Sequence, residues 1–177
     1  MAITTDQLKG SYGEREAQAL YHELKAVGDY IGFIQQMMYA DDYQVVRNAF
    51  WVLTKATDSE LSQLQPILHK LIDLALTTPN SSVRRLSLNI IERLKISEDD
   101  LRTDFFDFCI EHMTDVNELP GIQSICMKLA YHMSAYYPEL NDELIRIVDG
   151  MEIEYYKPAV RSARTRILRG TLKRTRR

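Results

Sequence analysis

One short pattern recurs four times along the chain at almost constant spacing. Each copy begins with a β-branched anchor residue, and the anchors are Val46, Val83, Ile122 and Val160. Successive anchors lie 37, 39 and 38 residues apart. A fixed period of this length is typical of repeat architectures, in which each repeat is one supersecondary unit. The period therefore limits the chain to a stack of similar units.

Each anchor opens an amphipathic helix. After Val46, for example, apolar residues follow at Ala49 and Leu53, and the same positions are apolar after the other three anchors. Offsets of three and seven residues fall on one stripe of an α-helix, which is the pattern of a packed face. We therefore expect anchor helices near residues 42–56, 80–94, 120–136 and 157–169.

A second helix is expected before each anchor helix. These segments have apolar residues every three or four positions and span residues 29–39, 58–76, 97–113 and 138–151. Thr57 with Glu60, and Ser97 with Asp100, have the spacing of capping boxes that satisfy the first free amides of a helix. A further helix over residues 14–26 would cover the first repeat. The prediction is an all-α fold: a short right-handed α-solenoid of about four helical hairpins with an extra N-terminal helix.

The hairpin around Pro66 resembles a HEAT repeat. Pro66 lies inside its first predicted helix, a turn containing Asn80 follows, and Val83 and Arg84 open its second helix. The resemblance extends over residues 29–170, although the third repeat has Gln instead of Arg after its anchor. The layout is also similar to small bacterial single-domain HEAT-like proteins with no assigned activity. The resemblance implies stacked helical pairs and no particular chemistry.

Length and composition agree with one helical domain. The chain has 177 residues, and its seven Gly and five Pro leave little material for the many tight turns of a β-sandwich or barrel. We expect a single repeat domain over residues 1–170 and a basic tail over residues 171–177. Residues 1–10 lack the apolar core of a secretory signal, and no stretch approaches the roughly 20 apolar residues that span a bilayer. We therefore expect a cytoplasmic protein that does not contact the membrane.

The carboxyl-terminal end is strongly basic. The net charge is −3, yet residues 157–177 contain nine Lys or Arg and no acid. Candidate residues of this basic end are Arg161, Arg164, Lys173 and Arg174. Three interpretations stay open: the polar outer face of a terminal repeat with cations near a helix carboxyl end, packing against the acidic body, or contact with nucleic-acid phosphates.

The sequence carries no signature of catalysis, of a cofactor or of a metal. Its seven Gly are too dispersed for a phosphate-binding loop, and its four His are far apart within predicted helices. Cys109 and Cys126 lie among apolar residues, which indicates buried free thiols, with a disulfide or a metal role as the alternative. We predict a protein that is not an enzyme and needs no cofactor.

The leading functional hypothesis is a protein-interaction scaffold. Solenoids bind protein or peptide partners on a concave surface, usually lined by the second helices. Inward residues are expected two, six and nine positions after each anchor. The candidates include Arg85, Asn89, Lys128, Tyr131, Arg166 and Arg169, with Asn48 and Val52 in the first repeat. The Arg that follows the anchors is interpreted instead as a structural contact to acidic or carbonyl groups of the adjacent turn.

The alternative hypothesis is nucleic-acid binding. It is prompted by the basic end and by an analogy in fold, because HEAT-like DNA alkylation-repair glycosylases are built from similar repeats. No grouping of Trp, Asp and Arg in this sequence aligns with their catalytic site. The identity of the partner and the oligomeric state stay open.

Overall fold

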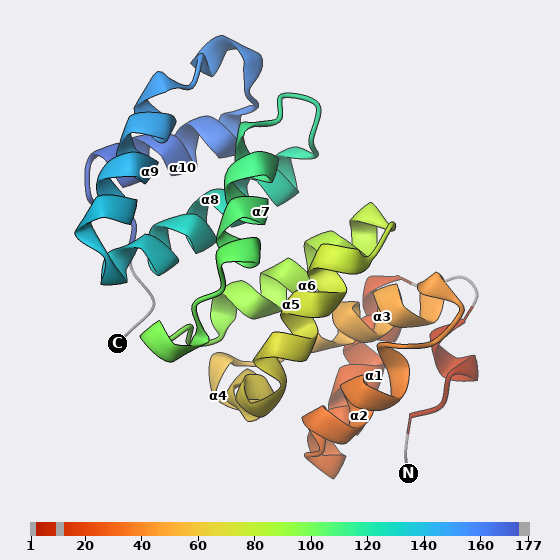
Figure 1. Cartoon of the computed structure of the whole chain (residues 1–177). Coiled ribbons are helices and arrows are strands. Elements are labelled where there is room, and N and C mark those ends of the chain that lie inside the picture. The colour runs from red at the N-terminus through yellow and green to blue at the C-terminus, as the bar shows by residue number, and fades with distance from the viewer. Residues whose placement is uncertain (1–2, 10–12, 174–177) are drawn as a thin grey trace. The chain divides into compact units, whose positions relative to one another are not determined.

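The computed structural model describes residues 3–9 and 13–173, and within them it contains helices and no strands (Figure 1). The chain forms two compact units, Met1–Leu94 (unit 1) and Lys95–Arg177 (unit 2). The expected single domain over residues 1–170 stays a prediction. Within the described residues, no helix combines the length and the apolar character needed to cross a bilayer.

Unit 1 contains an N-terminal helix followed by two helical hairpins. Its α-helices are α1 (Glu14–Val27), α2 (Tyr30–Met37), α3 (Tyr43–Leu53), α4 (Asp58–Leu61), α5 (Leu68–Thr77) and α6 (Ser81–Arg93), with a short 3-10 helix at Asp6–Leu8. Helix α2 packs against α3, and α5 packs against α6. The second helices α3 and α6 pack against each other, and α1 packs on α3 as the predicted extra helix.

Unit 2 contains the other two hairpins. Its α-helices are α7 (Thr103–Thr114), α8 (Pro120–Met133), α9 (Pro138–Gly150) and α10 (Pro158–Leu168), with 3-10 helices at Glu98–Asp100, Ser134–Tyr136 and Ile153–Tyr155. Helix α8 packs against α7, α9 and α10. All four anchor helices, α3, α6, α8 and α10, begin and end within three residues of their predicted bounds. The structure confirms an all-α fold of helical hairpins.

Pro66 interrupts the first helix of the second hairpin. The sequence predicts one continuous helix over residues 58–76, whereas the structure has α4, a 3-10 segment at Ser62–Ile67, and then α5. Proline lacks an N–H and its ring clashes with the carbonyl one turn earlier, so a regular α-helix cannot pass through it. Leu64 and Ile67 nevertheless remain buried, so the broken segment still contributes to the core.

The predicted caps are present. In unit 1, Thr57 and Glu60 form a reciprocal capping box, with the Thr57 amide donating to Glu60 Oε2 at 2.7 Å. The Asn80 side chain accepts hydrogen bonds from two amides at the start of α6. In unit 2, Ser97 and Asp100 form the second predicted box, but it caps the 3-10 helix Glu98–Asp100. The α-helix expected over residues 97–113 begins only at Thr103. The capping side chains satisfy backbone amides that a helix start leaves unpaired.

The Arg after the second anchor holds its own hairpin together. Arg84 donates from Nε to the Ala75 carbonyl at 3.2 Å and from Nη2 to the Thr78 carbonyl at 2.6 Å. Both carbonyls belong to the carboxyl end of α5, where helical acceptors lack intrahelical partners. This contact confirms the structural interpretation for Arg84.

Unit 2 repeats this contact with different chemistry. Gln123, which replaces Arg in the third repeat and is 2 % exposed, donates to the Asp115 carbonyl at 2.5 Å. Arg161 in the fourth repeat donates to the Tyr156 carbonyl at 2.7 Å. In each case the residue after the anchor satisfies a carbonyl of the turn before its helix. The departure of the third repeat from the Arg pattern therefore preserves the contact.

The two cysteines lie in the core of unit 2. Cys109 on α7 and Cys126 on α8 are both fully buried and both free. Burial raises the pKa of the Cys109 thiol well above its usual range, and a hydrogen bond with Cys126 adds to the rise. The structure thus confirms the expected buried free thiols.

Candidate functional site

A groove of about 450 Å³ lies between α3 and α6 in unit 1. We call it the α3/α6 groove, and its lining residues are Arg47, Trp51, Thr54, Ser82, Arg85, Leu86 and Asn89. Among the residues that the structure describes, no Asp or Glu lines it. Two guanidinium groups in one groove without a carboxylate give it a positive character.

The N-terminal segment decides which face of α3 is open. Asn48 and Val52, which the sequence analysis placed on the concave surface, are both 0 % exposed. They are covered because α1 and the 3-10 helix Asp6–Leu8 pack against α3. The expectation for these two residues was therefore wrong. The groove is lined instead by Arg47 and Trp51 of α3 and by Thr54 directly after it, which lie on a neighbouring stripe.

Arg47 is held in place by the buried Asn48. The Arg47 Nε and Nη2 atoms donate to Asn48 Oδ1 at 3.0 and 2.9 Å. The Asn48 amide in turn donates to the Leu8 carbonyl at 2.7 Å, so both polar ends of the buried Asn are satisfied. Unlike Arg84, Arg47 does not donate to the carbonyls of the preceding turn. Its Nη1 group takes no part in the hydrogen bonds to Asn48. The guanidinium is thus oriented before any ligand arrives.

Arg85 and Asn89 form the opposite wall of the groove. They lie four residues apart on α6, so their side chains share one face of the helix. Arg85 is exposed and Asn89 is half-buried. The structure therefore brings together these two predicted binding residues with Arg47 and Trp51, which the sequence analysis did not assign to a site. The sequence signal for Arg47 and Trp51 is the predicted N-terminal helix, because a helix that covers one stripe of α3 leaves a different stripe open.

This arrangement can recognise a carboxylate beside an apolar or aromatic group. Arg offers a planar fork of N–H donors that matches a carboxylate in a bidentate manner. Trp51 is half-buried at the groove wall and offers a flat aromatic surface beside the two arginines. Arg and Trp are also, together with Tyr, the residues in which binding energy is most often concentrated at protein interfaces.

The remaining candidate residues for partner binding lie in unit 2. Lys128 on α8 is half-buried, and Arg166 and Arg169 at the end of α10 are exposed. Tyr131 is only 7 % exposed, so it belongs to the core of unit 2 and has little area to offer a partner. No ligand contact tests these four residues, and they stay predictions.

Two arginines of the basic end, Arg161 and Arg164, satisfy neighbouring carbonyls. Arg164 donates from Nε to the Val148 carbonyl and from Nη2 to the Asp149 carbonyl, both at 2.8 Å, and lies 3.4 Å from the Asp149 carboxylate. These carbonyls belong to the carboxyl end of α9, where a cation is favoured by the helix dipole. Together with the Arg161 contact, this favours a structural role for these two arginines over contact with nucleic-acid phosphates.

The rest of the basic end is only partly described. His132 on α8 lies 3.2 Å from the Lys173 carbonyl through Nε2, and the neighbouring Leu172 is buried. Arg174 lies outside the described residues, as does the tail from residue 174 onward. Among the residues that are described, no group of three or more His, Cys, Asp or Glu side chains is placed to hold a metal ion.

Comparison with known proteins identifies one family. The family is described as a HEAT repeat domain, and its model matches residues 4–171. No curated protein and no solved structure matches the chain. The match covers nearly the whole chain and agrees with the helical hairpins of both units.

Proposed function

Because the chain belongs to the HEAT repeat domain family, we propose that it is a non-enzymatic scaffold that binds a partner protein. The α3/α6 groove would receive an acidic segment of that partner. The observation that carries this proposal is the placement of Arg47 and Arg85 in one open groove that no carboxylate lines among the described residues. Both charges can therefore be complemented from outside.

The groove is well prepared for an anionic ligand. Arg47 is already fixed by Asn48, so little side-chain entropy is lost when it binds. Arg85 approaches from the other helix and completes a pair of donors across the groove. Trp51 supplies apolar area beside the charges. An Asp or Glu next to an apolar side chain is the ligand that uses all three residues.

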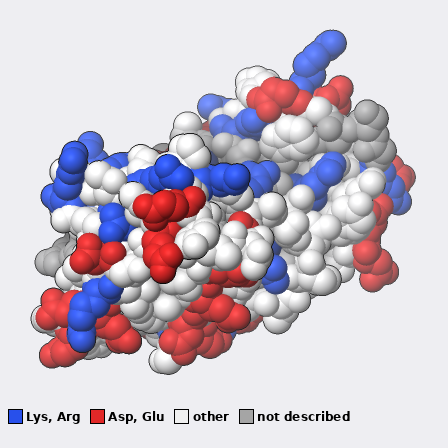
Figure 2. Space-filling model, turned by 90° about the horizontal axis from the view of Figure 1, so that it is seen from above, with Lys and Arg blue, Asp and Glu red and all other residues white. Residues whose placement is uncertain are grey.

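The distribution of charge favours a protein partner over a nucleic-acid duplex. Figure 2 shows Lys and Arg interspersed with Asp and Glu on the face that it draws. Duplex binding depends on contacts with many phosphates and benefits from an extended positive surface. The chain as a whole is acidic, with a net charge of −3. Two arginines in a local groove fit a short acidic segment better.

Affinity purification from the native cell tests the proposal with a matched pair of variants. Arg85→Glu reverses a charge in the groove, whereas Lys70→Glu makes the same change at an exposed site on α5 outside it. We expect the wild type and Lys70→Glu to recover the same stoichiometric partner, and Arg85→Glu to lose it. The partner's acidic segment, made as a peptide, should then bind the wild type and not Arg85→Glu in a calorimetric titration.

Two outcomes would contradict the proposal. Retention of the partner by Arg85→Glu would remove the groove from the interaction. A DNA or RNA duplex that binds the wild type at low salt, and that Arg85→Glu no longer binds, would favour the nucleic-acid hypothesis. Phosphate contacts strengthen as salt falls, so absence of binding at low salt would remove that alternative.

A further inference from the structure

A second groove, of about 410 Å³, lies in unit 2. Its walls come from α7 and α9, which are the first helices of their hairpins and both pack against α8 (Figure 1). Met133 at the end of α8 is 1 % exposed and also lines the groove. Three helices of one unit therefore build this α7/α9 groove.

Apolar side chains from both helices line the α7/α9 groove. Helix α7 contributes Phe106 and Ile110, and α9 contributes Leu140 and Ile147. The two members of each pair are four and seven residues apart, so each pair lies along one face of its helix. All four side chains are half-buried, which leaves apolar surface open to the groove. A hydrophobic groove between helices is the geometry that receives the apolar face of an amphipathic helix.

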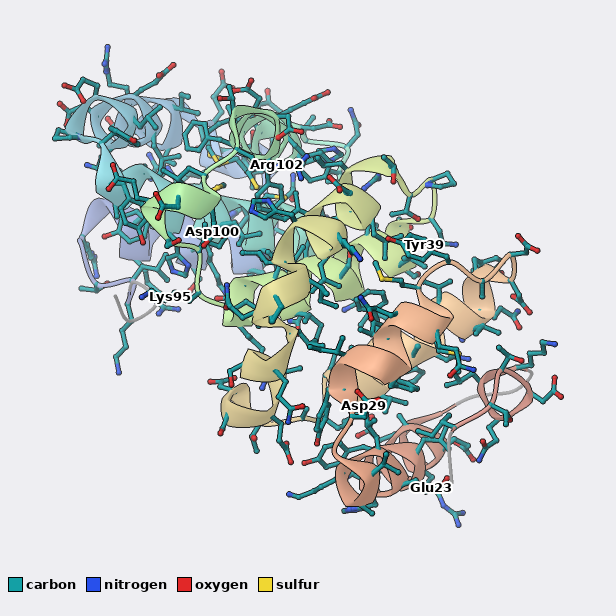
Figure 3. All side chains as sticks on the ribbon, turned by 60° about the horizontal axis from the view of Figure 1, so that its bottom comes forward. Glu23, Asp29, Tyr39, Lys95, Asp100 and Arg102 are labelled. Atoms are coloured by element: carbon teal, nitrogen blue, oxygen red, sulfur yellow. The ribbon has the colours of Figure 1, made fainter. Side chains whose placement is uncertain are left out.

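Carboxylates surround this apolar surface. Glu98, Asp107 and Glu143 are exposed and line the same groove from three different elements. The one basic residue in the described lining is Arg102, labelled near the start of α7 in Figure 3. Its guanidinium lies 2.7 Å from the carboxylate of Asp104, which already offsets its charge. The groove is therefore apolar within and negative at its edge.

An aromatic residue stands at the same edge. Tyr137, which precedes α9, is 43 % exposed and lines the groove. A hydrogen bond from its hydroxyl to Glu98 raises the pKa of Tyr137 above its ordinary value. Tyr combines apolar area with a polar group, which makes it a frequent contact residue at protein interfaces.

We propose that the α7/α9 groove docks a short amphipathic helix of a partner protein, one with apolar residues on one face and Lys or Arg along its borders. The apolar face would lie on Phe106, Ile110 and Leu140. The basic residues would face Asp107 and Glu143, whose charge selects a cationic partner and accelerates its association. The site is independent of the α3/α6 groove and has the opposite charge. One chain would thereby hold two partners of different chemistry.

A fluorescence-anisotropy titration tests this proposal with defined peptides. The probe is a labelled 14-residue peptide of Leu and Lys, with Leu spaced to form one face of a helix. A scrambled peptide of the same composition is the reference, since it has the same charge without the apolar face. We expect the wild-type chain to bind the ordered peptide about tenfold more tightly than the scrambled one, because only the ordered peptide buries its Leu side chains together.

A matched pair of variants locates the binding. Asp107→Lys changes the edge of the groove, and Glu111→Lys makes the same charge change one turn later on α7, at an exposed residue outside the groove. We expect Asp107→Lys to weaken binding of the ordered peptide about tenfold at low salt, with Glu111→Lys close to the wild type. Leu140→Ala should weaken it as well, with its circular dichroism melting curve as the check on folding. Arg85→Glu should bind the peptide like the wild type.

Several results would overturn the proposal. Equal binding of the ordered and scrambled peptides would leave only unspecific charge attraction. Equal losses in Asp107→Lys and Glu111→Lys would place the binding elsewhere. Light scattering of the chain alone supplies a third test, because a dimer that Asp107→Lys dissociates would mean that a second copy occupies the groove.

Discussion

The side-chain amide of Asn48 donates a 2.7 Å hydrogen bond to the carbonyl of Leu8, 40 residues earlier in the chain. This bond ties the N-terminal segment to α3 and simultaneously presents Asn48 Oδ1 to Arg47. The covering segment therefore does more than close the first repeat. It buries one stripe of α3 and orients the arginine on the next stripe toward the α3/α6 groove.

Replacing Asn48 should reduce both stability and binding. Asn48→Ala leaves the carbonyl of the fully buried Leu8 without its donor, and it leaves the half-buried Arg47 without its acceptor. We expect the free energy of unfolding to fall by about 1–3 kcal/mol, because an unsatisfied buried polar group loses its hydration without compensation. Urea denaturation measures this loss. Asn89→Ala, on the groove wall and half-buried, is the control and should change stability by less than about 0.5 kcal/mol.

Adjacent arginines on α6 should behave very differently. Arg84 bonds to the carbonyls of Ala75 and Thr78, whereas Arg85 is exposed in the groove. We expect Arg84→Ala to destabilise the chain by about 2 kcal/mol, since two charge-assisted hydrogen bonds are lost. Arg85→Ala should leave the melting temperature nearly unchanged and weaken partner binding instead. Similar melting temperatures for the two variants would show that the Arg84 contacts add little to stability.

The regular parts of the fold follow from the sequence because they depend on local patterns. The apolar stripe after each anchor fixes the second helices, and capping residues such as Thr57 and Asn80 mark helix starts. The same reasoning identified Arg85 and Asn89, since the open face of α6 is the one expected for a second helix. Where a repeat is regular, spacing along the chain is sufficient.

The remaining site residues depend on contacts that spacing does not encode. Asn48 and Val52 have the spacing of open-face residues, but the segment around Leu8 covers them. The α7/α9 groove likewise depends on how far apart two first helices lie on α8, which no periodicity within either helix specifies. The sequence pattern alone therefore does not distinguish Phe106 and Ile110, which line the groove, from ordinary core residues.

The two thiols should be unreactive in the folded chain. Cys109 and Cys126 are fully buried, and burial raises the pKa of Cys109 well above its usual range, which suppresses the reactive thiolate. We expect Ellman's reagent at pH 8 to label neither thiol rapidly in the native protein and both in urea. A Ser81→Cys variant, with an exposed position at the start of α6, supplies the positive control. Rapid native labelling of the wild type would show frequent opening of the α7–α8 core.

The capping carboxylate of Glu60 should make stability depend on acid pH. The hydrogen bond from the Thr57 backbone amide is the main cause that lowers the pKa of Glu60 to about 2, from 4.5 for an ordinary Glu, and the Tyr21 hydroxyl adds a 2.9 Å bond. A depressed folded pKa means that this stabilisation is complete above pH 4.5 and is lost as the pH falls towards 2. Glu60→Gln should therefore be less stable than the wild type by about 1 kcal/mol at pH 7, with the difference disappearing as the pH falls through that window. Urea denaturation from pH 7 to pH 2 measures the gap. Thr57→Ala should also flatten the pH dependence of stability, because it removes the Thr57 hydroxyl, a further donor to the carboxylate. A gap between wild type and Glu60→Gln that stayed constant over this range would mean that the Glu60 charge is not what stabilises the start of α4.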